Sequence, residues 1–181
     1  MKMKPFVAAL AVVVSLMSLI SCEKEGVKLF DGNYSFKTSG ILTVERTAKV
    51  SESDASAGIL DFPDGNRTFR LALTSESGQM NVIKTGDNSV IVTMNVVGGD
   101  AFVFSGKAEG KVLTLDPAVR FVSFRDGANT VSLEITVSGT AEKHDDVAIF
   151  TLEYTGGGET TLYDYKILAS EVKCVAKLNE D

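Results

Sequence analysis

The sequence contains no tryptophan, one histidine and two cysteines among its 181 residues. A tetrahedral zinc site of the usual kind draws its ligands from several histidine and cysteine side chains, and this chain has too few of them. The acidic spacing typical of calcium loops is also absent. The sequence therefore predicts no metal site. The shortage of histidine and cysteine also leaves few general bases or nucleophiles, so we expect a protein that is not an enzyme.

Basic residues are outnumbered as well. The chain has 18 lysines and arginines against 24 acidic residues, which gives a formal net charge of −6. A protein that binds nucleic acid or anionic lipid through an extended basic face usually carries the opposite balance. We therefore predict no nucleic-acid partner.

Only one uncharged apolar run is long, and it lies at the N-terminus. Residues 6–20 follow Lys2 and Lys4, and the run is shorter than the roughly 20 residues that a membrane-spanning helix needs. A cationic start followed by a short apolar core is typical of a signal peptide. The run ends in Leu19-Ile20-Ser21-Cys22.

This ending resembles the lipobox of bacterial lipoproteins. The resemblance implies cleavage between Ser21 and Cys22, a diacylglyceryl group on the Cys22 thiol, and an acyl chain on the new amine. These lipids would hold the protein on a membrane, and we predict no other cofactor. An ordinary secretory signal and a membrane-spanning anchor are the alternatives. Removing residues 1–21 removes two lysines and no acidic residue, so 16 basic and 24 acidic side chains remain and the net charge becomes −8.

The remaining chain divides into two parts. Residues 22–30 are predicted to form the acylated cysteine and a polar tether, and residues 31–181 a single β domain. The segment Glu23-Lys24-Glu25-Gly26 resembles the export tether of Bacteroidetes surface lipoproteins, although a charged linker is the other interpretation. We expect the protein to be anchored by lipid in the outer membrane. The sequence leaves two alternatives for the domain, the cell surface and the periplasmic face.

Apolar and polar residues alternate with a period of two along most of the domain. Val131, Leu133, Ile135 and Val137 show the pattern most clearly, and such alternation is typical of half-buried antiparallel strands. Thirteen runs read as strands, some of which must merge: 32–38, 40–48, 57–62, 67–75, 78–85, 88–97, 101–107, 111–116, 118–125, 129–140, 146–155, 159–168 and 171–178. Turn dipeptides rich in Gly, Asp and Asn separate many of them.

Strands that follow one another through short turns favour an antiparallel meander. The predicted fold class is therefore all-β, as an up-and-down barrel of about 8–11 strands, with a two-sheet β-sandwich as the alternative. Together with the lipobox and the acidic tether, the start Asp31-Gly32-Asn33-Tyr34 resembles the calycin-like, or lipocalin-like, lipoproteins of Bacteroidetes. That resemblance implies a barrel that binds a ligand. The chain departs from the lipocalin Gly-x-Trp motif, because it has no tryptophan.

Two potentially reactive side chains are predicted to be structural. His144 lies among Glu and Asp residues between two strong strands, which indicates an exposed hairpin loop. Cys174 alternates with apolar residues and loses its only partner if Cys22 carries lipid. It is therefore predicted to be a buried core residue without a disulfide.

Tyr163 and Tyr165 are the candidate ligand-binding residues. They share one strand face on either side of Asp164, and tyrosines beside an acid can stack on sugar rings and bind hydroxyl groups. A half-buried structural face is the other interpretation. The predicted function is a non-enzymatic lipoprotein that binds a small apolar or glycan ligand in the mouth of the barrel. The alternative is a structural or accessory module that binds protein partners in an envelope complex.

Overall fold

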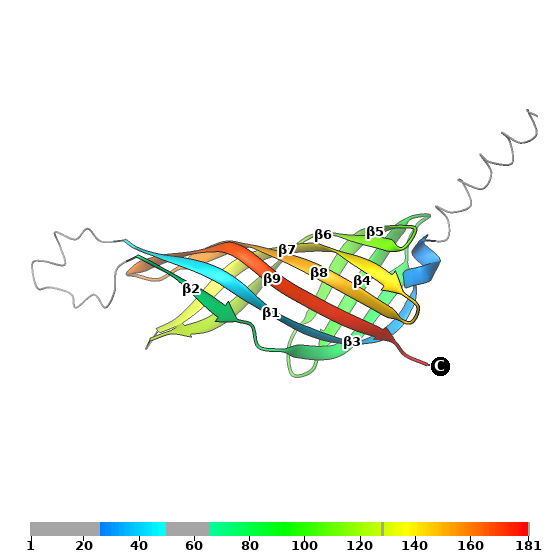
Figure 1. Cartoon of the computed structure of the whole chain (residues 1–181), viewed down its shortest axis with the longest axis horizontal. Helices are drawn as coiled ribbons and strands as arrows, with labels where there is room; N and C mark the ends of the chain where they lie inside the picture. The colour runs from blue at the N-terminus through cyan, green and yellow to red at the C-terminus, as the bar shows by residue number, and fades with distance from the viewer. Residues whose placement is uncertain (1–25, 50–65, 128, 181) are drawn as a thin grey trace, which may run out of the picture.

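The computed structural model describes residues 26–49, 66–127 and 129–180 and consists almost entirely of antiparallel strands (Figure 1). Nine strands follow one another along the described chain. They are β1 (Gly32–Ala48), β2 (Arg67–Ala72), β3 (Glu76–Lys84), β4 (Ser89–Val96), β5 (Ala101–Glu109), β6 (Val112–Asp126), β7 (Asn129–His144), β8 (Val147–Glu159) and β9 (Tyr163–Leu178). In these residues there is no helix long and apolar enough to cross a membrane.

Eight of the strands form a closed ring. The order runs from β1 through β3, β4, β5, β6, β7 and β8 to β9, and β9 pairs back with β1. This last ladder joins the first strand to the final one, so the predicted up-and-down barrel is confirmed and the sandwich alternative is wrong. Closure removes the edges that a long meander would otherwise expose.

The strands are fewer and longer than the predicted runs. Runs 32–38 and 40–48 merge into β1, runs 111–116 and 118–125 into β6, and the last two runs into β9. Bulges absorb the irregular positions, for example between Leu115 and Ala118, where the β6–β7 register shifts around Pro117. The predicted run 57–62 lies outside the described residues.

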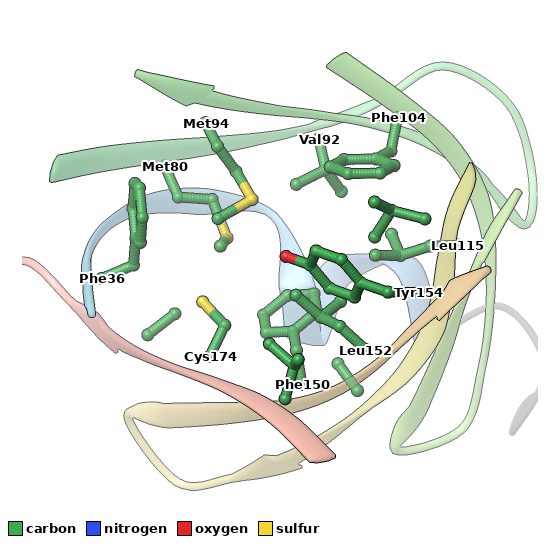
Figure 2. Close-up of a cluster of buried hydrophobic side chains, with 14 of the residues drawn as sticks. Phe36, Met80, Val92, Met94, Phe104, Leu115, Phe150, Leu152, Tyr154 and Cys174 are labelled. Carbon is green, nitrogen blue, oxygen red and sulfur yellow. The ribbon is translucent and has the colours of Figure 1, made fainter. Parts of the chain in front are cut away.

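Apolar side chains fill the inside of the barrel. Figure 2 shows Phe36, Met80, Phe104, Phe150 and Cys174 pointing into the same interior space. Cys174 is fully buried and is not bonded to another cysteine, so its predicted place in the core is confirmed. Burial raises the pKa of its thiol to about 11, an effect that the Thr38 hydroxyl partly offsets, so the thiol stays protonated at neutral pH.

A short helix, residues 26–30, closes one end of the barrel (Figure 1). Val27 and Phe30 lie three positions apart on it, and both side chains are completely buried. The Tyr34 hydroxyl donates a hydrogen bond of 2.8 Å to the carbonyl oxygen of Phe30. The sequence placed residues 26–30 in the predicted polar tether; in the structure they form this helix, and their buried apolar side chains pack against the barrel.

The ring is incomplete at the opposite end. The first half of β1 pairs with β3, but from Ile41 onward the same edge of β1 pairs with β2. On the other side of the opening, β5 pairs only with residues 112–115 of β6. Residues 118–126 of β6 then pair with β7 alone among the described strands. We call the opening between β2 and residues 118–126 of β6 the seam.

Candidate functional site

A cavity of about 290 Å³ opens at the seam. Leu71 and Leu73, at the end of β2 and just beyond it, form one wall, and Val122 and Phe124 of β6 form the other. The Tyr154 side chain, on β8, reaches the cavity from across the barrel. Farther along the seam, the Phe69 and Phe124 rings approach within 5.8 Å between their centroids, so side chains rather than a backbone ladder join the two strands there.

An ion pair forms the polar part of the cavity. Arg120 Nη2 donates to Glu76 Oε1 at 2.7 Å, and Arg120 Nη1 donates to Glu76 Oε2 at 3.3 Å. Nη1 also lies 3.4 Å from the Tyr154 hydroxyl oxygen. The guanidinium carbon lies 3.9 Å from the centroid of the Phe102 ring, which covers one of its faces. Arg120 is therefore held in a fixed orientation, and its charge is balanced by one carboxylate.

Two buried polar atoms in this region are under-satisfied. The Nε of Arg120 has no hydrogen-bond acceptor among the described residues. Among the residues that the structure describes, the Thr38 hydroxyl has only the neighbouring thiol of Cys174 as a hydrogen-bond partner. Unmade hydrogen bonds of buried groups typically cost about 1–3 kcal/mol each. A buried polar group of this kind calls for a specific explanation, such as a role in the site or an ordered water.

Two further hollows meet at Arg120. One, of about 100 Å³, lies between Phe102 on β5 and Ala118 on β6. The other, of about 400 Å³, is bordered by Gly99, Val119 and Phe121 on the outer side of the seam. The cavity and both hollows share Arg120 as a lining residue. The candidate site is thus a groove along the side of the barrel.

The predicted tyrosine pair lies elsewhere. Tyr163 and Tyr165 point into the barrel at the end opposite the short helix, and both are almost fully buried. The Tyr165 hydroxyl donates to Asp126 Oδ2 at 2.8 Å, and the Arg46 guanidinium carbon lies 4.4 Å from the Tyr163 ring centroid. Neither tyrosine is among the residues that line the seam cavity. As ligand-binding residues they stay a prediction, and their contacts in this structure are structural.

Asp126 organises this cluster. Arg46 Nη1 donates to its Oδ2 at 3.0 Å, and both side chains are more than nine-tenths buried. Burial alone would raise the pKa of Asp126. Hydrogen bonds from Tyr165 and Arg46, with the charges of Arg46 and Arg67, outweigh burial and hold the pKa below its usual value of 3.8. Burial and the bond to Asp126 raise the pKa of Tyr165 to about 12. The cluster closes this end of the barrel.

A buried lysine lies beneath the helical plug. Lys143 Nζ donates to the Tyr34 hydroxyl at 3.0 Å and lies 4.5 Å from the centroid of the same ring. Burial lowers the pKa of Lys143, and burial together with the charge of Asp31 raises the pKa of Tyr34 to about 12. Side chains therefore occupy both ends of the barrel, and the cavity opens from its side.

The remaining sequence candidates fall into two groups. His144 is exposed at the end of β7, 3.5 Å from a carboxylate oxygen of Glu142, as the hairpin prediction required. The described residues contain no cluster of three or more His, Cys, Asp or Glu side chains that could hold a metal. Ser21 and Cys22 lie outside the described residues, and their predicted processing stays a prediction.

The sequence contains one weak indication that Arg120 belongs to a site, but the strand pattern around it is ambiguous. Between Ala118 and Phe124, apolar residues occupy both faces of β6, and Arg120 shares the inward face with Val122. An arginine on the inward face of a barrel strand needs a buried partner or a ligand. Its partner, Glu76, lies 44 residues away, and no local pattern connects the two.

Comparison with known proteins gives only distant structural similarity. No family model and no curated protein sequence matches this chain. A solved structure of EF1p2_mFAP2b bound to DFHBI has 9% sequence identity and a TM-score of 0.39 over 87% of this chain and 99% of that one. A redesigned β-barrel has 13% identity and a TM-score of 0.34 over 86% of this chain and 96% of the other. At these values neither match assigns a ligand to this chain.

Proposed function

We propose that this protein is a lipid-anchored binding protein whose β-barrel holds a small, mostly apolar molecule in the seam cavity. The observation that carries the proposal is the cavity itself: leucine, valine and phenylalanine side chains surround an Arg120–Glu76 ion pair that is fixed in place. Small-molecule sites typically combine apolar walls with a few oriented polar groups. The ligand would enter from the side, in place of the barrel mouth expected from the sequence.

The anchor and the place of the protein in the cell are part of the same proposal. The signal-peptide pattern and the lipobox around Cys22 support acylation, and the acidic segment after it supports transport to the outer membrane. A barrel with a binding site would also agree with the calycin-like lipoproteins that the sequence resembles. The glycan alternative is less favoured, because the two tyrosines that would bind a sugar are buried and engaged.

Binding is favoured over catalysis by the chemistry of the cavity. Both charges in it are already paired with each other, and the thiol of Cys174 behind Thr38 is protonated at neutral pH. A nucleophile activated by an adjacent base would have a different set of contacts. Accessory binding to envelope proteins is the second candidate, and it is supported by Val119 and Phe121, which are 63% and 64% exposed beside the seam.

A ligand-shift screen tests the proposal directly. The full chain, purified in detergent, is titrated with a panel of small alcohols, ketones, esters and fatty acids while backbone amide resonances are followed. We expect the shifts to concentrate at Leu71–Leu73 and Ala118–Phe124. The variant Val122→Trp fills the cavity and should abolish them, whereas Val175→Trp, at an exposed position of β9 away from the seam, should preserve them. Equal binding by both variants, or no binding by any compound, would rule out the cavity as the site.

A further inference from the structure

We propose that the seam accepts an extended acidic peptide, which adds as a strand along β6 and places one apolar side chain in the cavity. This inference rests on the proposed function, because it names the kind of partner that occupies the same site. Three observations carry it: a free strand edge, exposed apolar residues beside that edge, and the position of the arginines.

The free edge is long and continuous. Residues 118–126 of β6 pair with β7 on one side, while their other edge has no ladder partner in the described chain. Alternate amide and carbonyl groups on such an edge lack backbone partners. An extended chain can satisfy them by forming one more ladder. Across the seam, β2 is the last strand of the sheet order and presents a second edge.

The usual protections of an exposed edge are missing from residues 118–126. This stretch contains no proline and no lysine, and its register with β7 is regular after Ala118. The outward side chains of Val119 and Phe121 are largely exposed. Edge strands that must avoid other chains commonly carry lysine, proline or a bulge. β6 instead presents exposed apolar side chains beside a regular edge, an arrangement that favours pairing.

Charge selects the partner. The chain has only five arginines, and four of them lie on the two strands that border the seam: Arg67 and Arg70 on β2, and Arg120 and Arg125 on β6. Within β2 and residues 118–126, the only carboxylate is Asp126, which is buried and already bonded to Arg46 and Tyr165. Arg120 pairs with Glu76, Arg70 lies 3.4 Å from Glu171, and Arg67 lies 4.0 Å from Asp126. Arg125 is the seam arginine without an ion-pair partner among the described residues, in a protein whose net charge is −6. Its charge complements an acidic segment.

The same charges disfavour pairing between two copies of this chain. An antiparallel contact between two β6 edges would bring Arg125 of each copy near the basic edge of the other, without an unengaged carboxylate in either stretch 118–126. Like charges opposite one another across strands are destabilising. A peptide with acidic residues on its outward face avoids this repulsion. Its alternate, inward residues would point toward Val122 and Phe124, where the cavity is apolar.

The test uses blocked octapeptides of defined sequence. A fluorescent peptide that alternates Glu and Val is titrated into the full chain in detergent, beside a Lys–Val peptide and a Glu–Val peptide with two central prolines. We expect the Glu–Val peptide to bind and to protect amides of residues 118–126 from hydrogen exchange. The Lys–Val and proline-containing peptides should bind at least roughly tenfold more weakly, because one loses charge complementarity and the other cannot form the ladder.

Matched variants locate the contact. Arg125→Glu reverses an exposed charge beside the seam and should weaken Glu–Val binding roughly fivefold or more. Lys173→Glu makes the same charge change on the outer face of β9, which is paired on both sides, and should leave binding unchanged. Equal losses in the two variants, or equal binding of the proline peptide, would overturn strand addition.

Other outcomes separate this inference from the proposed function. If small apolar compounds bind in the cavity and no peptide does, the inference fails and the proposed function stands. If neither class binds, both fail.

Two further outcomes would assign the edge to another partner. If no peptide binds, but vesicles containing anionic lipid bind and Arg125→Glu weakens that binding, the edge contacts a membrane surface. A dimer at micromolar concentration that Phe121→Asp dissolves would assign the edge to a second copy. Either of these results overturns the peptide proposal.

Discussion

Arg120 and Glu76 connect two strands that share no ladder: Arg120 Nη2 on β6 lies 2.7 Å from Glu76 Oε1 at the start of β3. The pair crosses the barrel where backbone pairing between β5 and β6 has ended. Its side chains are 13% and 28% exposed, so solvent screens it only in part. This contact fixes the separation of β3 and β6 beside the seam, and it forms the polar part of the cavity wall.

Replacing Glu76 with Gln should destabilise the protein, because Arg120 would keep a half-buried charge without its carboxylate. We expect a loss of about 1–2 kcal/mol in the free energy of unfolding, less than for a fully buried pair. Urea denaturation followed by circular dichroism measures the loss. Arg120→Met in the Glu76→Gln background should recover part of it. If Glu76→Gln alone is as stable as the parent, the ion pair does not contribute to the free energy of unfolding.

Asp126 predicts a specific sensitivity to acid. Its pKa is lower in the folded protein than the ordinary value of 3.8, so the folded state binds fewer protons and is favoured while the carboxylate stays ionised. That stabilisation is fully present above about pH 4 and is lost as the pH falls through the folded pKa. Asp126→Asn should lower stability at pH 7 by about 3 kcal/mol, since it leaves Arg46 without its buried carboxylate.

The acid dependence distinguishes this effect from a general loss of packing. Between pH 5 and pH 2, Asp126→Asn should lose less stability than the parent, because the group that titrates has been removed. Denaturant midpoints measured across that range provide the comparison. Asp164→Asn, at a more exposed carboxylate on β9, is the control. Parallel pH profiles for parent and Asp126→Asn would contradict the assignment.

Two tyrosines should resist ionisation. Burial raises the pKa of Tyr34 and of Tyr165 to about 12, and nearby acidic groups add to the effect. The stability that these tyrosines provide is complete below pH 10, the unfolded value, and falls as the pH rises toward 12. Tyrosinate absorbance of the native protein should therefore show at least two of the four tyrosines un-ionised at pH 10.5, and Tyr34 and Tyr165 should titrate once the chain unfolds. Full ionisation of a still folded protein would contradict their burial.

Counting reactive thiols tests the core cysteine and the anchor together. Native protein should resist alkylation at pH 8, because Cys174 is fully buried and its thiol pKa is raised to about 11. After denaturation, mass spectrometry should find one label, on Cys174, if Cys22 carries a thioether lipid. Two labels would show that Cys22 is free and that the lipobox is not used. Cys22→Ser should abolish incorporation of labelled fatty acid while leaving Cys174 protected.

The repeating pattern of this sequence was enough to predict the strands and to favour a barrel over a sandwich. Alternation in segments such as Val131–Val137 identifies strands, and the buried side of Cys174 follows from the same periodicity. Short turns then favour a meander, and a meander of this length avoids open edges either by closing or by splitting into two sheets. The ladder between β1 and β9, which decides for closure, joins the two ends of the domain and has no local signal in the sequence.

The seam was not predictable by the same means. It exists because one edge of β1 is divided between β3 and β2, which depends on the pairing of residues far apart in the chain. Pro117 marked where β6 becomes irregular, but it could not show which neighbour would be lost. In sequence, Tyr163 and Tyr165 fit either a ligand-binding pair or a half-buried structural face, and the partner Asp126 that holds Tyr165 lies 39 residues away. One helical turn at Val27 and Phe30 is too short for a periodic signal.

The helical plug fixes how the barrel could be mounted on a membrane. Only three residues separate Cys22 from Gly26, and even a fully extended chain of that length reaches no more than about 15 Å. If Cys22 carries the proposed lipid, the plugged end must face the bilayer closely. The hairpin between β6 and β7 lies at the opposite end (Figure 1). In this orientation the seam, which lies toward the end of the barrel opposite the helix, would face away from the bilayer. Partners could then reach it without contacting the lipid.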